Sequence, residues 1–236
     1  MTTLLLDMDG VLVDVSGSYR RAVAETFAHF AGRELAAGAI QEKKDAGGFN
    51  NDWVLTHTLL AEAGADVPYA DVVADFRRRY RGDAYDGLIR TERPAIQTAT
   101  LERLAERYAL ALVTGRPEAD AQWTLDHFGW AELIPVVIGM DQQAGREKPD
   151  PYPVRLALER LGADAAGAAF AGDTVDDIAA ARGAGVLPIG VVPPGHPPSH
   201  GDTLRAAGAA LVLASPDGLP AALQSAAEGR GAERGG

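Results

Sequence analysis

Cysteine is absent from the 236-residue chain, which excludes disulfides, thiolate zinc sites and cysteine nucleophiles. Basic residues are scarce, since 22 Lys and Arg stand against 33 Asp and Glu, giving a formal net charge of −11. That net charge argues against electrostatic binding of nucleic acid or an anionic membrane over a broad surface. No apolar run reaches the roughly 18 residues that a membrane-spanning helix needs, and the N-terminus lacks the basic and long apolar regions of a secretion signal. We therefore expect a cytoplasmic enzyme without nucleic-acid or membrane partners, either monomeric or homodimeric.

Six short apolar runs recur along the chain, and helical periodicity fills most of the intervals between them. The runs are Thr3–Leu6, Leu110–Val113, Pro135–Ile138, Ala168–Ala171, Leu187–Val192 and Ala209–Leu213. Strands that alternate with helices predict right-handed βαβ units and a parallel sheet covered on both faces. The expected fold is therefore α/β, with a Rossmann-like parallel sheet core.

One interval breaks the alternation of strands and helices. Residues 15–93 contain helical patterns but no convincing strand, so we expect an inserted α-helical cap there. Residues 1–14 and 94–215 then form the catalytic core. The stretch 216–236 is rich in Ala, Gly and Pro, and we expect it to be a flexible C-terminal tail.

Two aspartates, Asp7 and Asp9, directly follow the first apolar run and precede Gly10. They therefore lie at the carboxyl end of a predicted buried strand, where open α/β sheets bind ligands. Neighbouring acids at such a place repel one another and are costly to desolvate unless a cation or a shared proton compensates. A calcium loop does not explain them, because an EF-hand needs an acid at its fifth position, which is Val11 here.

Polar residues follow two other predicted strands as well. Thr114, Gly115 and Arg116 come after the second apolar run, while Asp173 and Asp177 lie in the turn after the fourth. Taken singly, the later acids could be helix N-caps and the threonine an ordinary turn residue. Lys148 stands before a proline-rich helix start, and alone it could be a solvated lysine.

Together these residues suit phosphoryl transfer. Mg²⁺ prefers a few carboxylates together with water and phosphate oxygens. One carboxylate can act as nucleophile, a second can carry protons to and from the reacting oxygens, and a hydroxyl and an ammonium can meet the charge on the phosphoryl group.

With these four motifs in order, the chain resembles a haloacid-dehalogenase-superfamily hydrolase of the branch whose helical cap is inserted after the first strand. The family's motifs match as DxD at Asp7–Asp9, a strand-end Thr at Thr114, a Lys at Lys148 and GDxxxD at Gly172–Asp177. The resemblance implies a Mg²⁺-dependent phosphatase that forms an aspartyl phosphate and hydrolyses a small-metabolite phosphomonoester.

The resemblance also implies a role for each matching residue. Asp7 is expected to be nucleophile and metal ligand, and Asp9 to be general acid/base with its main-chain carbonyl on the metal. Thr114 is expected to bond the phosphoryl oxygens, and Lys148 to balance charge. Asp173 and Asp177 are expected to complete the metal site, while the contribution of Asp176 stays open.

The insertion supplies candidates for binding the leaving group. By resemblance, the stretch 41–53 is a specificity loop of the cap, although it could equally be an exposed interhelical loop with Asp52 capping the next helix. Arg116 is a further substrate-binding candidate with a surface role equally open, and Gly115 accompanies it. The cap residues expected to bind substrate are Arg20, Lys43, Lys44, Asn51 and Trp53.

Alternative activities differ mainly in what they require of Asp9. A dehalogenase would need neither this acid nor Mg²⁺, and the phosphonatases of the family resemble DxA at the first motif. A sugar phosphomutase shares the whole catalytic set and differs in the lifetime of the phosphoenzyme. A non-catalytic binding module is disfavoured because every expected catalytic position is filled.

Overall fold

The computed structural model describes residues 1–233, with side chains described as far as Glu228. The chain divides into two compact units. The first combines Met1–Val13 with the chain from Pro94 onward, and the second is Asp14–Arg93, against the 15–93 expected for the insertion.

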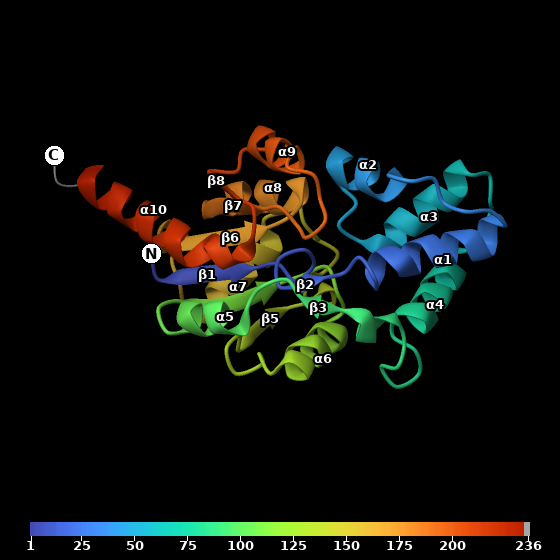
Figure 1. Ribbon diagram of the computed structural model, residues 1–236, viewed down its shortest axis with the longest axis horizontal. Helices are drawn as coiled ribbons and strands as arrows, with labels where there is room; N and C mark the ends of the chain where they lie inside the picture. The colour runs from blue at the N-terminus through green and yellow to red at the C-terminus, as the bar shows by residue number, and fades with distance from the viewer. Residues whose placement is uncertain (234–236) are drawn as a thin grey trace. The chain divides into compact units, whose positions relative to one another are not determined.

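The first unit is built on a six-stranded sheet in the order β5-β4-β1-β6-β7-β8 (Figure 1). All five strand pairs are parallel, so the predicted α/β class with a parallel sheet is confirmed. The strands are β1 (Thr3–Leu6), β4 (Ala109–Val113), β5 (Val136–Ile138), β6 (Ala168–Gly172), β7 (Leu187–Val191) and β8 (Leu211–Leu213).

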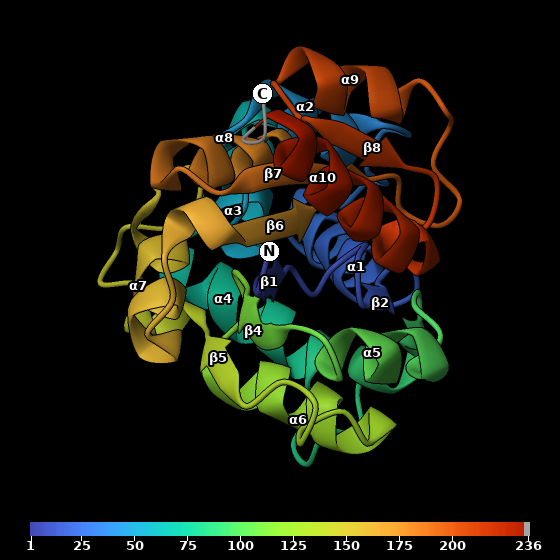
Figure 2. The ribbon, with the colours of Figure 1, turned by 90° about the vertical axis from the view of Figure 1, so that its left-hand side faces the viewer.

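Helices cover both faces of this sheet, as Figure 2 shows. On one face α7 and α8 pack against β4, β5, β6 and β7, and α5 and α10 pack together on the other. The helices of this unit are α5 (Thr98–Ala105), α6 (Glu118–Phe128), α7 (Tyr152–Leu161), α8 (Val175–Ala184), α9 (His200–Ala206) and α10 (Leu219–Glu233), with short 3-10 turns η2 (Met140–Gln142), η3 (Ala165–Gly167) and η4 (Pro216–Gly218).

The core beneath α7 and α8 consists of alternate strand residues, as the period of two along a strand requires. Leu5, Ala111, Val113 and Phe170 point into it together with Val154 of α7. Because β1, β4 and β6 are covered on both faces, their side chains are almost all buried, which explains why these strands appear in the sequence as continuous apolar runs.

The second unit contains α1 (Tyr19–Ala31), α2 (Ala39–Ala46), α3 (Asp52–Glu62), α4 (Tyr69–Tyr80) and the 3-10 turn η1 (Leu88–Thr91). Helix α1 packs against both α3 and α4. The apolar centre of this unit includes an aromatic cluster. In it, the ring centroids of Tyr19 and Tyr80 are 4.0 Å apart, and Phe76 lies beside Tyr19. At the junctions of the two units, β2 (Val13–Asp14) pairs with β3 (Arg93–Pro94).

Two segments differ from the sequence-based expectation. Ala39–Ala46 is a helix rather than part of a loop. The segment 216–233, expected to be a flexible tail, forms η4 and α10 instead. Leu219 and Leu223, four residues apart, are both fully buried, so one face of α10 is anchored by apolar packing. Residues 234–236 lie outside the described residues.

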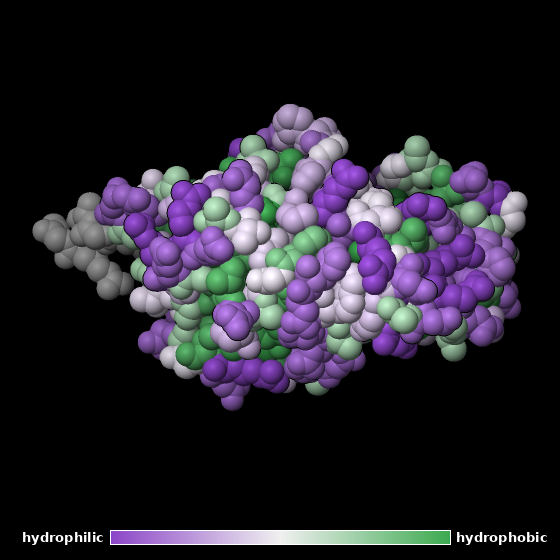
Figure 3. All heavy atoms as spheres, turned by 60° about the horizontal axis from the view of Figure 1, so that its bottom comes forward, coloured by the Kyte–Doolittle hydropathy of each residue, from purple (hydrophilic) through white to green (hydrophobic). Residues whose placement is uncertain are grey.

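Hydrophilic side chains predominate on the face shown in Figure 3, with smaller hydrophobic patches between them. Within residues 1–228, the large hydrophobic side chains that are exposed are Val54 and Tyr69. Among the described residues, none of the helices combines the length and the apolar character needed to cross a membrane.

Candidate active site

Three adjacent strands at the centre of the sheet deliver the predicted site residues to one edge. Asp7 follows β1, Thr114 follows β4 and Asp173 follows β6, and β1 lies between the other two strands. The chain runs from β1 outward through β4 and β5, then returns to the other side of β1. This reversal makes the carboxyl end of β1 the position where α/β sheets form ligand sites.

Buried carboxylates cluster at this edge. One oxygen each from Asp7, Asp173 and Asp177 lies within 4.8 Å of the others, and all three residues are buried. Two glycines leave room for the cluster. Gly10 has a φ of +76° and a Cβ there would collide with the Asp173 carboxylate, while a Cβ on Gly172 would collide with Asp177. The DxDG and GD patterns therefore have a steric reason as well as a chemical one.

Lys148 is the ammonium of the cluster. Its Nζ donates to Asp7 Oδ1 at 2.9 Å and to the main-chain carbonyl of Val113 at 3.3 Å, and it lies 2.6 Å from Asp177 Oδ1. Burial alone would lower the pKa of Lys148, but Asp177 and Asp7 outweigh burial and raise it. Lys148 is therefore a permanent cation between two buried carboxylates.

Asp7 lacks full compensation for its own charge. Burial raises the pKa of the Asp7 carboxyl from 3.8 to about 7, Lys148 opposes the rise, and Asp177 and Asp9 add to it. A buried carboxylate that shares one ammonium with another acid favours a proton or a further cation nearby. The site is thus electrostatically suited to an added positive charge.

Asp177 organises the turn that carries Asp173. Its Oδ2 accepts from the main-chain N–H groups of Asp173 and Thr174 and from the Thr174 hydroxyl at 2.7 Å. The Thr174 hydroxyl accepts in return from the Asp177 N–H, completing a capping box at the start of α8. The N-cap of α8 is therefore Thr174, and Asp177 is the N3 residue of the capping box rather than the N-cap. The role of Asp177 in a metal site stays a prediction.

Asp9 lies outside the three-carboxylate cluster. Its Oδ1 accepts from Arg116 Nε at 2.7 Å and lies 2.6 Å from Arg116 Nη2. Arg116 is only 1% exposed and its Nη1 donates to the Thr124 hydroxyl of α6 at 3.0 Å. The surface role left open for Arg116 is therefore wrong, and its guanidinium is engaged with Asp9 rather than facing open solvent.

Thr114 is buried in a turn fixed by its neighbours. Its hydroxyl accepts from the Arg116 N–H at 3.2 Å across Gly115, and its carbonyl accepts from Gln143 Nε2 at 2.7 Å. The Thr114 N–H extends the sheet by donating to Ile138. Its placement at the strand end agrees with the expected position, and its phosphate contact stays a prediction.

Sequence reasoning missed three residues that support this edge: Thr124, Gln143 and His200. His200 of α9 is buried, and its Nε2 lies 2.7 Å from the main-chain oxygen of Asp173. Its segment follows β7 at the same edge of the sheet, which was the available signal. A threonine within a helix and a glutamine in a short turn carried no comparable signal.

The cap candidates have structural partners within the second unit. Lys43 pairs with Glu62, and Lys44 Nζ lies 3.0 Å from Asp52. Asn51, not Asp52, is the N-cap of α3, accepting from the main-chain N–H of Trp53 at 3.0 Å. Arg20 Nη2 donates to Gln41 at 2.9 Å. Trp53 is half-buried, and substrate binding by these residues stays a prediction.

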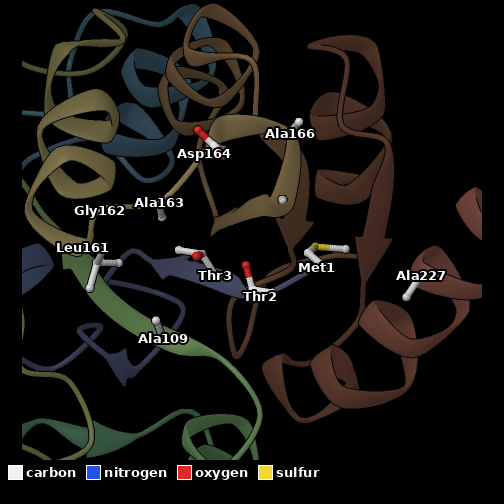
Figure 4. Close-up of a pocket in the computed structure, with 11 residues that line it drawn as sticks. Met1, Thr2, Thr3, Ala109, Leu161, Gly162, Ala163, Asp164, Ala166 and Ala227 are labelled. Atoms are coloured by element: carbon white, nitrogen blue, oxygen red, sulfur yellow. The ribbon is translucent and has the colours of Figure 1, made fainter.

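A pocket of about 660 Å³ lies at the opposite end of the strands (Figure 4). Thr2 and Thr3 at the start of β1, the segment around Gly162 and Ala227 of α10 line it. The residues that line it include neither the clustered acids nor Lys148. The chemistry of the carboxylate edge therefore does not extend into this pocket.

Comparison with known proteins adds a family context to this geometry. A family model described as haloacid dehalogenase-like hydrolase matches residues 1–185. The chain is 32% identical over 227 residues to the plasmid phosphoglycolate phosphatase of Cupriavidus necator, covering 95% of this chain and 94% of the relative. It is 39% identical over 226 residues to an imidazoleglycerol-phosphate dehydratase of Phytophthora nicotianae, covering 89% of this chain but 49% of the relative, so it spans about half of that protein.

A solved structure is also similar over nearly the whole chain. It is a HAD family hydrolase from Deinococcus radiodurans R1 with bound phosphate and sodium. The TM-score is 0.72 at 26% identity, and the alignment covers 96% of each chain. The similarity thus extends over both units of the chain.

Proposed function

We propose a phosphatase function for this chain, which belongs to the haloacid dehalogenase-like hydrolase family. In this proposal the protein hydrolyses a small phosphomonoester through an aspartyl phosphate on Asp7 and depends on Mg²⁺. The observation that carries the proposal is the position of Asp7. It lies buried at the carboxyl end of the central strand, bonded to Lys148 and clustered with Asp173 and Asp177.

The residues present fit a magnesium ion. The cluster offers only oxygen ligands, which Mg²⁺ prefers, and the raised pKa of Asp7 indicates a deficit of positive charge. Asp7, Asp173 and Asp177 would hold the ion, with the main-chain carbonyl of Asp9 as a further ligand implied by the family resemblance. When bound, the ion supplies positive charge that favours the ionised form of Asp7 and neutralises phosphate oxygens.

The chain's own residues then divide the reaction into two steps. Asp7 attacks phosphorus, forming an acyl phosphate as the bond to the leaving oxygen breaks. Asp9 donates a proton to that oxygen and later accepts one from the attacking water. Lys148, bonded to Asp7 at 2.9 Å, offsets negative charge on the nucleophile, and Thr114 donates to a phosphoryl oxygen.

The substrate class follows from the relatives. The relative that aligns over 94% of its length is named a phosphoglycolate phosphatase, so 2-phosphoglycolate is the first substrate to test. Imidazoleglycerol phosphate is the second, because the relative from Phytophthora nicotianae is named for it. Both compounds are small phosphomonoesters.

The test is phosphate release from these two compounds and from 4-nitrophenyl phosphate with Mg²⁺. Wild type is expected to turn over at least one compound, with activity abolished by chelator and by Asp7→Asn. The Asp164→Asn variant is a matched control, because Asp164 lines the pocket at the opposite end of the sheet, and it should keep full activity.

Two outcomes would contradict the proposal. Failure of wild type with Mg²⁺ to release phosphate from any member of a broad phosphometabolite panel would refute the phosphatase activity. Phosphoryl transfer to a sugar phosphate in preference to water would instead indicate a mutase that uses the same catalytic residues.

A further inference from the structure

One arginine holds a single oxygen of Asp9. Both Nε and Nη2 of Arg116 lie within hydrogen-bonding distance of Asp9 Oδ1, at 2.7 and 2.6 Å. A carboxylate oxygen has two lone pairs, so two N–H donors on Oδ1 occupy both. The usual fork-to-fork pairing, with one N–H on each oxygen, is not what these two distances describe.

We propose that Arg116 is a positioning residue that reserves Oδ2 of Asp9 for proton transfer. This inference rests on the proposed phosphatase function and assigns the proton to one oxygen. With Oδ1 engaged by two donors, a proton on that oxygen would face N–H groups at hydrogen-bonding distance. Oδ2 is therefore the oxygen through which the proton is transferred, and the two bonds to Oδ1 oppose rotation of the carboxyl group.

Arg116 is itself fixed in place. Its Nη1 donates to the Thr124 hydroxyl, which donates in turn to the main-chain oxygen of Asp120 within α6. The Arg116 N–H bonds the Thr114 hydroxyl. The guanidinium is thus held by the turn after β4 and by α6, whereas Asp9 comes from the turn after β1. Such support is what a side chain needs to fix a reacting group within a fraction of an ångström.

The side chains of Arg116 and Asp9 differ in their exposure to solvent. The Arg116 side chain is 1% exposed, and that of Asp9 is 27% exposed. The accessible member of the pair is the acid, so Asp9 can meet a substrate while Arg116 stays behind it. The guanidinium is engaged with Asp9 and Thr124, and in this proposal it acts through Asp9 rather than on the substrate phosphate.

In this proposal one atom, Oδ2 of Asp9, transfers the proton in both steps of the reaction. In the first step Oδ2–H gives its proton to the leaving oxygen, which keeps the electron pair of the broken P–O bond. In the second step the same Oδ2, now ionised, takes a proton from the water that attacks phosphorus, while the bond from phosphorus to the Asp7 oxygen breaks and its electron pair returns to the Asp7 carboxylate. Arg116 neither gains nor loses a proton in either step.

The test compares substrates that differ in their need for an acid. The leaving group of 4-nitrophenyl phosphate departs as a stabilised phenolate, whereas that of 2-phosphoglycolate is an alkoxide that needs protonation. Positioned acid catalysis contributes about 100-fold or more, so Arg116→Gln is expected to lower the rate of leaving-group release in the first turnover about 100-fold for the alkyl ester. The first turnover is measured by rapid quench at saturating substrate, because the later hydrolysis of the aspartyl phosphate is common to both esters. The loss for the aryl ester should be much smaller, with KM for both little changed.

Arg116→Lys and Thr124→Val separate the positioning role from a folding defect. Lysine keeps the positive charge but offers a single nitrogen, which cannot reproduce the paired contacts of Nε and Nη2 with Oδ1, so Arg116→Lys should restore part of the alkyl-ester activity. Thr124→Val keeps Arg116 and removes only its anchor, so it should show a smaller loss with the same substrate preference. Gln143→Leu is the matched control, because Gln143 is also fully buried and bonded to the same turn. Its effect should be equal on both esters.

A double-mutant cycle with Asp9→Asn decides whether Arg116 acts through Asp9. On the alkyl ester the double variant should be no slower than Asp9→Asn alone. Equal losses of the first-turnover rate on both esters, a rise in KM without a fall in that rate, or additive losses in the cycle would each overturn the positioning role. A wild type that is inactive on both esters would instead reject the phosphatase function on which this inference rests.

Discussion

Lys148 shows at the scale of a single residue how the candidate site balances charge. Its ammonium is bonded to Asp7 and lies 2.6 Å from Asp177, and all three side chains are nearly inaccessible. The attraction between Lys148 and the two carboxylates offsets the cost of desolvating these charges only while all three groups are present. Removal of the cation would leave two buried carboxylates facing one another.

Lys148→Met is therefore expected to destabilise the protein strongly and to abolish phosphatase activity. Breaking a buried ion pair by removing one partner costs on the order of 3–5 kcal/mol, measurable by urea unfolding in the presence of chelator. Lys44→Met is the matched control, because Lys44 also pairs with an aspartate but is 15% exposed. A Lys148→Met variant as stable and active as wild type would contradict the charge balance inferred for the cluster.

Residue type and position after predicted strands were enough to single out the carboxylates, whereas Lys148 was singled out before a proline-rich helix start. Their roles were implied by the family resemblance. Residue type and position were not enough for Arg116, whose partner Asp9 is 107 positions away in the sequence. Pairings of that kind depend on side-chain direction after folding, which local patterns do not contain. Asn51 is the opposite case, since its local role as the N-cap of α3 accounts for the side chain predicted to bind substrate.

At the scale of elements, Asp75 connects α4 to α1 through charged side chains. It accepts from Arg78 and Arg79 one turn further along α4, and Arg79 also pairs with Glu25 of α1 at 3.2 Å. Burial alone would raise the pKa of Asp75, but the hydrogen bonds and charges of Arg79 and Arg78 outweigh it and lower the pKa. The ionised form is therefore the one that stabilises this helix pair.

Asp75→Asn should destabilise the protein at neutral pH by about 1.5–3 kcal/mol, the range for hydrogen bonds to charged groups. Because the pKa is lower in the folded state, the contribution is complete above the ordinary value of 3.8 and disappears as pH falls through the lowered pKa. Urea unfolding from pH 7 into acid should show the variant approaching wild type. A stability difference that stays constant with pH would count against the ionic role.

Helix α10 was the largest misjudged element, since its Ala- and Gly-rich sequence resembles a linker. Two leucines four positions apart, Leu219 and Leu223, form its buried stripe beside α5. Helix α2 was missed for a related reason, because none of its residues is buried and glycines flank it. Weak amphipathic patterns of this size are set by packing partners rather than by local sequence.

Leu223→Ala tests whether α10 is part of the folded core. A large-to-small change at a fully buried leucine costs about 2–5 kcal/mol, so the unfolding midpoint should fall clearly. Gln224→Ala, at the next and exposed position, should leave the midpoint unchanged. Indistinguishable midpoints for the two variants would restore the flexible tail that the composition predicted.

At the scale of the whole molecule, the parallel sheet made the common edge of the candidate residues predictable. Alternating strands and helices predict a parallel sheet, and in such a sheet the carboxyl ends of neighbouring strands meet at one edge. The sequence could not give the strand order itself, which places β1 between β4 and β6. That order brings together Asp7 and Asp173, which are 166 positions apart in the sequence, and it depends on long-range pairing.

Magnesium should link this acidic edge to the stability of the molecule. A ligand that binds only the folded state stabilises it by about 2.7 kcal/mol at 100 times its Kd, so Mg²⁺ is expected to raise the Tm of wild type above its value in chelator. Asp173→Asn removes one of three clustered carboxylates and should abolish the shift, whereas Asp164→Asn should preserve it. Because the molecule carries a net charge of −11, diffuse cation binding could also raise Tm, but that effect would be the same in both variants. Equal Mg²⁺ shifts in wild type and Asp173→Asn would therefore show that the clustered carboxylates are not the binding site.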